Sequence, residues 1–165
     1  MSITIERVEG ATPALAAFLD AHHADMEDTA PAESRHALPF DRLLAPGVRL
    51  FAAWADSVPV ATGALAAVAD GHEELKSMRT APAMRGQGLG RSMLGFLLAD
   101  AAARGIRRIS LETGSMDFFI PARALYARAG FVECGPFGGY RPDPLSTFMT
   151  LALPAASVAP EVRTG

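Results

Sequence analysis

The chain has 165 residues, of which 15 are basic and 18 acidic, and its formal net charge is -3. This length suits one domain that buries enough surface to hold a core without disulfides. Half of the residues are hydrophobic and a fifth are charged, which excludes a disordered chain and a collagen-like repeat. The slight negative charge gives no broad basic field, so we expect no nucleic-acid partner.

Cysteine content and the length of the hydrophobic runs indicate in which compartment the protein works. The single cysteine, Cys134, excludes an internal disulfide, and no Cys/His spacing resembles a zinc site, so we expect no metal. Residues 1–7 lack a basic segment followed by an apolar core, and no continuous apolar stretch is long enough to cross a membrane. The sequence therefore predicts a cytoplasmic protein with no membrane partner.

The first half of the chain predicts strands around one helix. Residues that alternate between apolar and polar indicate strands, and apolar residues at helical spacing indicate a helix. Two apolar runs are separated by a short polar turn, which predicts an antiparallel hairpin. In chain order, the predicted elements are a strand at 2–8, a helix at 11–24, a loop or short helix at 25–39, and strands at 48–54, 58–68 and 72–80.

The second half predicts two helices, each followed by a glycine that tolerates the left-handed conformation at a helix end. The predicted elements are a helix at 89–104 before Gly105, a strand at 106–111, a helix at 121–129 before Gly130, and strands at 131–134 and 147–153. Residues 1–153 thus form one predicted domain, and 154–165 a predicted disordered tail. The order predicts an α/β fold with a mixed sheet and helices on both faces.

A glycine-rich turn, Arg85-Gly-Gln-Gly-Leu-Gly90, joins a predicted strand to a predicted helix. Glycines let a ligand approach the backbone, and the free N–H groups and dipole of a helix start favour a pyrophosphate. No Gly-Lys pair occurs, which excludes a P-loop, and the third glycine of a dinucleotide fingerprint would fall on Arg91 or Met93. A glycine-rich helix start without a ligand stays an alternative.

This turn is similar to the acyl-CoA signature of the GNAT family of N-acetyltransferases, Arg/Gln-x-x-Gly-x-Gly/Ala. The stretch Ala122-Arg-Ala-Leu-Tyr-Ala-Arg-Ala-Gly-Phe131 resembles the family's second signature, and residues 131–149 are similar to its YsnE-like branch. The resemblance covers roughly residues 48–152. It implies the GNAT fold, with one mixed, mostly antiparallel sheet of about six to seven strands, helices on both faces and splayed central strands. It also implies acetyl-CoA as a co-substrate.

The resemblance places the contacts to acetyl-CoA on the third predicted strand and the turn. Backbone groups of Met78 and Thr80 match positions that hold the pantetheine arm. The pyrophosphate contacts fall on the amides of Arg85, Gly86, Gln87, Gly88, Leu89 and Gly90, with Arg91 and Ser92 at the edge. One position departs from the family, because Phe119 stands where many members have a cofactor-binding asparagine.

Glu74 is the candidate general base. An alkylamine has a pKa near ~10.4, so an acceptor amine benefits from a base at neutral pH. Glu74 lies four residues before Met78, which predicts that both side chains share one face of a period-two strand. Glu73 is expected on the other face as a solvent-exposed acid. A solvated Glu74 or a Glu74 salt bridge stays an alternative.

Tyr126 is the candidate general acid, because it occupies the tyrosine position of the second signature and a phenol stays protonated at neutral pH. The alternative is a tyrosine packed in the core beside Phe131. His22 and His23 lie at the end of the first predicted helix, near a loop that the GNAT resemblance places at the border of the acceptor site. A surface histidine pair is the other interpretation.

These residues predict direct attack of a primary amine on the acetyl thioester in a ternary complex, with a small-molecule acceptor. Two alternatives stay open, a protein or peptide N-acetyltransferase and a catalytically silent CoA-binding regulatory domain. A homodimer also stays open.

Overall fold

The computed structural model describes residues 2–27 and 38–154. Residues 155–165 of the predicted disordered tail and most of the loop or short helix predicted at 25–39 lie outside these residues. Along the chain the elements are β1 Ile3–Arg7, α1 Pro13–Glu27, α2 Phe40–Leu43, β2 Val48–Ala55, β3 Val58–Ala69, β4 His72–Thr80, α3 Leu89–Ala103, β5 Arg108–Gly114, α4 Ile120–Arg128, β6 Val132–Cys134 and β7 Ser146–Ala152, with short 3-10 turns at Pro82–Met84 and Asp117–Phe119.

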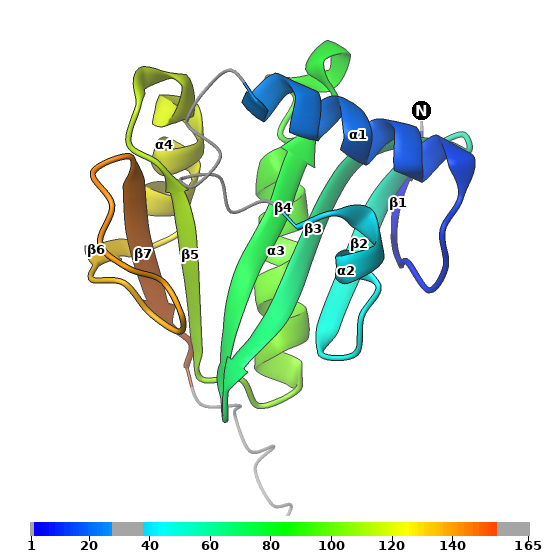
Figure 1. The fold of residues 1–165 in the computed structure, drawn as a ribbon. Coiled ribbons are helices and arrows are strands. Elements are labelled where there is room, and N and C mark those ends of the chain that lie inside the picture. Colours follow the sequence, from blue (N-terminus) through cyan, green and yellow to red (C-terminus); the bar gives the residue numbers. More distant parts are fainter. Residues whose placement is uncertain (1, 28–37, 155–165) are drawn as a thin grey trace, which may run out of the picture.

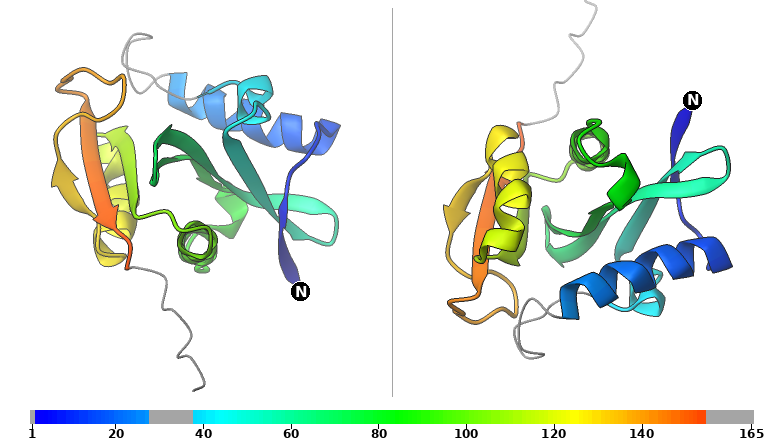
Figure 2. Two further views of the ribbon diagram at one scale, coloured as in Figure 1. Left: turned by 90° about the horizontal axis from the view of Figure 1, so that it is seen from below. Right: turned by 90° about the horizontal axis from the view of Figure 1, so that it is seen from above.

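The strands form one seven-stranded sheet in the order β1-β2-β3-β4-β5-β7-β6. All neighbours are antiparallel except β4 and β5, which α3 connects as a crossover. Helices α1 and α2 cover one face and α3 and α4 the other (Figures 1 and 2). The predicted α/β class, with a mixed, mostly antiparallel sheet and helices on both faces, is confirmed.

The two central strands separate along their length. β4 and β5 are paired only from His72↔Arg108 to Leu75↔Leu111, so the last five residues of β4 extend beyond the shared ladder. Figure 1 shows the two strands close together at one end and apart at the other. The predicted splay of the central strands is therefore present, and we call the opening beyond Leu75 and Leu111 the wedge.

Each face of the sheet has its own hydrophobic core. The core under α3 and α4 includes Leu97 of α3, Tyr126 of α4 and Leu65 of β3. The core under α1 and α2 includes Leu15 and Leu43. These two clusters show toward which face each side chain of the central strands points.

The strand predicted at 106–111 begins and ends later, at Arg108–Gly114. Ile106 closes the end of α3 instead, because its amide donates to the carbonyl of Ala101 at 3.0 Å. The amide of Arg107 donates to Gly71, in the turn between β3 and β4, at 2.8 Å. Gly105 has φ +83°, the left-handed conformation expected after a helix.

A bulge interrupts β4. Ser77 has φ +54°, and the register to β3 shifts so that Thr62 and Ala64 face Arg79 and Lys76. Two residues of β4, Ser77 and Met78, therefore lie opposite one residue of β3, Gly63. One additional residue in a strand reverses which side chains face each side of the sheet.

Candidate active site

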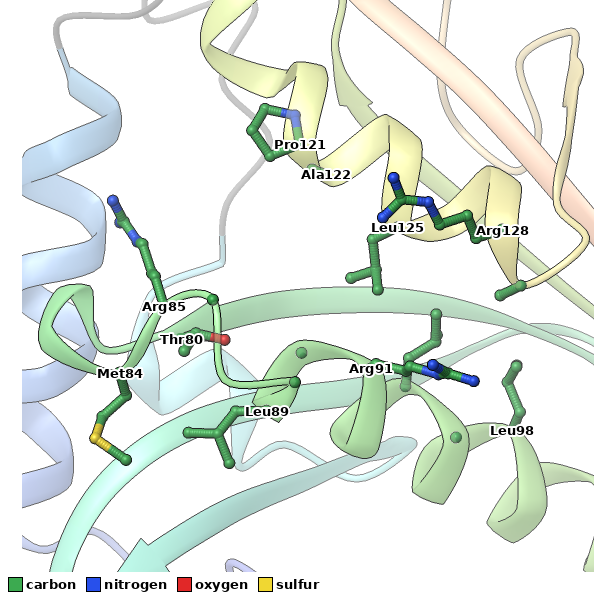
Figure 3. A pocket seen from close by; sticks show the side chains of 16 residues that line it. Thr80, Met84, Arg85, Leu89, Arg91, Leu98, Pro121, Ala122, Leu125 and Arg128 are labelled. Atoms are coloured by element: carbon green, nitrogen blue, oxygen red, sulfur yellow. The ribbon is translucent and has the colours of Figure 1, made fainter.

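A groove separates α3 from α4 and has a volume of about 980 Å³. Figure 3 shows Arg85 on the turn before α3, and Arg91 and Arg128 reaching into the space between the helices from α3 and α4. The groove is lined by Thr80, Met84, Arg85, Gly86, Gly88, Leu89, Gly90, Arg91, Leu94, Gly95, Leu98, Pro121, Ala122, Leu125, Arg128 and Ala129.

The glycine turn enters α3 through two left-handed residues. Gly86 has φ +78° and Gly88, the N-cap of α3, has φ +83°. An L side chain is strained at such angles, although a Cβ at either position would have no other heavy atom within 4 Å. The backbone path, not crowding, requires glycine here. The first-turn amides of α3, which have no acceptor within the helix, lie at the groove and suit an anion.

The groove walls follow helical periodicity on both sides. On α3, Arg91, Leu94, Gly95 and Leu98 are spaced by three, four and seven residues, and on α4 a matching stripe runs from Pro121 to Ala129. Open space surrounds the Cα of Gly95. Three guanidinium groups with apolar walls between them fit a ligand that has phosphates and an aliphatic arm.

The predicted contact residues divide into two groups. Thr80, Arg85, Gly86, Gly88, Leu89, Gly90 and Arg91 line the groove, whereas Met78, Gln87 and Ser92 do not. Sequence reasoning placed only the start of α4, at Pro121 and Ala122, beside the cofactor, and missed the rest of this wall, Arg128 above all. The helical spacing of Ala122, Leu125 and Arg128 marks one face of that helix, but only the fold shows that this face meets α3.

Met78 and Glu74 lie on opposite faces of the sheet, so the prediction that they share a face is wrong. Met78 packs against the α3 core, where its sulfur lies 2.9 Å from the position that a Cβ would take at Gly63. Glu74 instead shares its side with Lys76, on the α1 face. The bulge at Ser77 is the reason, because it breaks the period of two that the prediction assumed.

Glu74 belongs to a three-residue hydrogen-bonded cluster on the α1 face. Tyr140 Oη donates to Glu74 Oε2, and Lys76 Nζ donates to the same oxygen at 3.0 Å and to Tyr140 Oη at 3.0 Å. Burial, followed by the hydrogen bond and charge of Glu74, raises the pKa of Tyr140, so its hydroxyl remains protonated. We call these three residues the Glu74 cluster. It lies where the wedge begins to open, since Glu74 and the adjacent Leu75 are the last β4 residues paired with β5.

Glu73 is buried, with 7% exposure, which corrects the expectation of a solvent-exposed acid. Arg104 donates two hydrogen bonds to its carboxylate, at 2.7 and 2.9 Å. Arg104 also bonds Asp100 at 3.0 Å, and Asp100 pairs with Arg49 at 2.8 Å. These four charges attach the end of α3 to β2 and β4.

Tyr126 lies in the core under α3 and α4 and is 7% exposed. Its ring meets Phe131 edge to face, with centroids 5.9 Å apart. Burial, with the nearby charge of Glu112, raises the pKa of the phenol. The hydroxyl therefore keeps its proton at neutral pH, and the packing is that of the structural alternative. The catalytic role of Tyr126 stays a prediction.

The start of α4 is fixed to the end of β5. Arg123 Nη1 donates to the carbonyls of Gly114 at 2.5 Å and Met116 at 3.0 Å. The ring of Phe119 lies against Gly114, where a Cβ would clash with it. Phe119 thus has a packing role at the end of β5.

The described residues offer neither a membrane-spanning helix nor a metal-binding cluster. No helix within residues 2–27 and 38–154 is long and apolar enough to span a membrane. In the same part of the chain, no group of three or more His, Cys, Asp or Glu residues could hold a metal ion. His22 and His23 belong to α1, and their side chains lie outside the described part.

Comparison with known proteins agrees with this geometry. The family model for the acetyltransferase (GNAT) family matches residues 15–131. The chain belongs to the GNAT family. It is 38% identical over 153 residues to the uncharacterized N-acetyltransferase YsnE of Bacillus subtilis, covering 93% of this chain and all of that one. It is 39% identical over 150 residues to the uncharacterized N-acetyltransferase YedL of Escherichia coli, covering 91% and 94% of the two chains.

A solved structure described as an acyl-CoA N-acyltransferase from Klebsiella pneumoniae superposes with a TM-score of 0.70 at 30% identity. The match covers 92% of this chain and 97% of that one. The predicted GNAT fold and YsnE-like branch are therefore confirmed, and the protein is an acyltransferase of the N-acetyltransferase type.

Proposed function

We propose that this GNAT protein transfers the acetyl group of acetyl-CoA to the primary amine of a small molecule, by direct attack in a ternary complex. The observation that carries the proposal is the placement of two sites on either side of the wedge. The α3–α4 groove reaches Thr80 at the end of β4 from one face, and the Glu74 cluster lies at the floor of the wedge on the other face.

In this proposal the groove holds acetyl-CoA. The amides from Arg85 to Gly90 bind the pyrophosphate, and Arg91 adds positive charge beside it. The edge of β4 beyond Leu75 has no strand partner on its β5 side among the described residues. Its backbone groups can therefore pair with the pantetheine arm, with Met78 and Thr80 as the residues that hold it.

In this proposal, Glu74 and Tyr126 carry out the proton transfers of the reaction. Glu74 accepts a proton from the acceptor ammonium, directly or through water, so that the neutral nitrogen can attack the thioester carbonyl carbon. A new C–N bond forms and the C–S bond breaks. Tyr126 supplies a proton to the departing sulfur, and the amide nitrogen releases its second proton to solvent.

The depth of the Glu74 cluster supports a small acceptor. The side chains of Glu74 and Lys76 are 12% and 11% exposed, so an amine must reach a cluster that is largely covered by protein. A small molecule carries little bulk around its amine and can reach it. A protein or peptide acceptor and a silent CoA-binding domain are the outcomes against which the proposal is tested.

The test pairs a binding measurement with an activity measurement. Gly88→Ala should weaken CoA binding by about tenfold or more in calorimetry, because a methyl group obstructs the amides that bind phosphate. Gly105→Ala is the matched control, since Gly105 also has φ +83° and open space around it but lies at the far end of α3. Equal CoA affinity in both variants would contradict the groove assignment.

Activity is measured as free thiol released from acetyl-CoA with a panel of amines, amino acids and peptides. Release with small amines supports the proposal. Release with peptides alone would replace the small acceptor by a peptide. CoA binding without release for any member of the panel would indicate the silent domain.

A further inference from the structure

Tyr140 reaches the floor of the wedge from the segment between β6 and β7, 66 residues after Glu74 in the chain. Its ring packs on Phe137 and Phe148, with centroids 5.1 and 5.4 Å away. This aromatic packing fixes the phenol hydroxyl beside Lys76 and Glu74. The segment that carries Tyr140 therefore borders the Glu74 cluster, where the proposed function places the acceptor amine.

The cluster places opposite charges next to each other in a largely buried position. Glu74 Oε2 accepts hydrogen bonds from Lys76 Nζ and from the Tyr140 hydroxyl. Lys76 Nζ also lies 5.7 Å from the centre of the Tyr140 ring. Both charged side chains are about nine-tenths buried. A charge in such a place is costly to leave without a partner, because burial removes the water that would otherwise stabilise it.

This pairing restricts which acceptor can enter. An amine that engages Glu74 takes the carboxylate away from Lys76, and an acceptor with only a positive charge would leave Lys76 without its counter-ion. An acceptor with its own carboxylate replaces Glu74 as the partner of Lys76, and every charge stays paired. The 3.0 Å separation of Lys76 Nζ and Glu74 Oε2 requires the two groups of the acceptor to be adjacent as well.

We propose that the acceptor is an amine with a carboxylate on the neighbouring carbon, an α-amino acid, whose nitrogen meets Glu74 while its carboxylate binds Lys76 and Tyr140. This inference rests on the proposed acetyl transfer and names its substrate class. Neighbouring groups balance in charge, since Arg79 lies on the same face, stacked 5.4 Å from the Phe18 ring, and Glu112 acts on Tyr140 from β5. A zwitterion adds no net charge to this balance.

The experiment compares matched acceptors. Thiol release from acetyl-CoA is measured with each common L-amino acid and with the amine that remains when its carboxylate is removed, for example L-phenylalanine and phenethylamine. The parent protein should show a kcat/KM about 100-fold higher for the acid-bearing member of the best pair, because truncating one partner of a buried charge pair has effects of that size. Equal values within the pairs would overturn the inference while acetyl transfer stands.

Two variants then locate the carboxylate. Lys76→Met should bring the kcat/KM values of the amino acid and its matched amine within about threefold of each other. Tyr140→Phe keeps the ring contacts and should reduce the ratio of these two kcat/KM values by about tenfold. Arg108→Met is the control, because it removes a positive charge from the narrow, exposed end of the same face. It should keep the parent preference.

The remaining outcomes are decisive in the same way. A preference that survives both Lys76→Met and Tyr140→Phe would overturn the inference, since the carboxylate would then bind elsewhere. CoA binding without acetylation of any acceptor would instead remove the proposed function itself. Circular dichroism and CoA calorimetry show that each variant is folded, and Tyr140→Phe decides the question if Lys76→Met does not fold.

Discussion

The α3–α4 groove and the Glu74 cluster lie on opposite faces of the same sheet and are built in different ways. One side of the groove is a continuous segment, from Thr80 through the glycine turn to Leu98. The Glu74 cluster joins β4 to Tyr140 across more than sixty residues of chain. The groove depends on backbone conformation, whereas the cluster depends on side chains that the fold brings together.

This difference explains which region a motif can reveal. A helix start that binds phosphate needs glycines at fixed spacing. Its backbone amides bind the phosphate, and the left-handed conformation that orients them favours glycine. A side-chain cluster needs only compatible groups at one point in space, and their positions along the chain can vary freely. Substitutions should therefore separate the two regions, since the proposed function assigns CoA binding to the groove and turnover to the cluster.

The largest effect is expected from Glu74→Gln, which removes the proposed base. Turnover should fall by about 100-fold or more, and most at lower pH, where fewer acceptor amines are neutral. CoA affinity in calorimetry should equal that of the parent, because Glu74 lies on the face opposite the groove. Overlapping pH–rate profiles of variant and parent would show that Glu74 only stabilises the structure.

Tyr126→Phe should lower turnover by about tenfold or more with little change in CoA affinity or Tm. The change keeps the ring that packs on Phe131 and removes only the hydroxyl. The chain has two tyrosines. Comparing the turnover of Tyr126→Phe with that of Tyr140→Phe therefore separates the proposed proton transfer to sulfur from the proposed contact with the acceptor. Equal turnover in Tyr126→Phe and the parent would assign this hydroxyl a packing role and leave water as the proton source.

Arg128→Gln tests the groove wall that the sequence did not indicate. Loss of a guanidinium that faces a phosphate should weaken CoA binding by about fivefold to tenfold. Binding of 3′-dephospho-CoA should change less, if Arg128 meets the 3′-phosphate. Calorimetry with both ligands measures the difference in affinity. Arg123→Gln is unsuitable as a control, because Arg123 fixes the start of α4. An unchanged CoA affinity would place the phosphates nearer Arg85 and Arg91.

The smallest effect is expected from Asp100→Asn, because Asp100 neither lines the groove nor belongs to the Glu74 cluster. Burial alone would raise the pKa of Asp100, but the hydrogen bonds and charges of Arg49 and Arg104 lower it below its ordinary value of 3.8. Its stabilising contribution is therefore complete above that value and is lost as the pH falls through the lower folded pKa. At pH 7 the free energy of unfolding should drop by about 1 kcal/mol, with turnover unchanged.

Urea unfolding at several pH values measures this contribution. The difference between Asp100→Asn and the parent should shrink below pH 3.8. Asp20→Asn, at an exposed site on α1, should show no such difference. A difference between Asp100→Asn and the parent that stays constant with pH would mean that the ion pairs contribute nothing measurable.

Local patterns were sufficient for most of the fold. The hairpin of β2 and β3, the bounds of β4 and the left-handed glycines after α3 and α4 are set by short-range preferences, and the structure has them as expected. The period-two rule failed at one residue, Ser77, whose positive φ places Met78 and Glu74 on opposite faces. A serine in that conformation leaves no pattern in the neighbouring residues, so the failure could not be foreseen.

The sequence alone determined the family, the α/β class and the glycine turn before α3, because each is encoded in short segments whose backbone conformation follows from their own residues. Only the tertiary structure decided that Arg128 faces the groove, that Glu73 is buried against Arg104, and that Tyr140 meets Glu74. These contacts join segments far apart in the chain. Their geometry arises from how the helices and strands pack on the sheet, which no local pattern specifies.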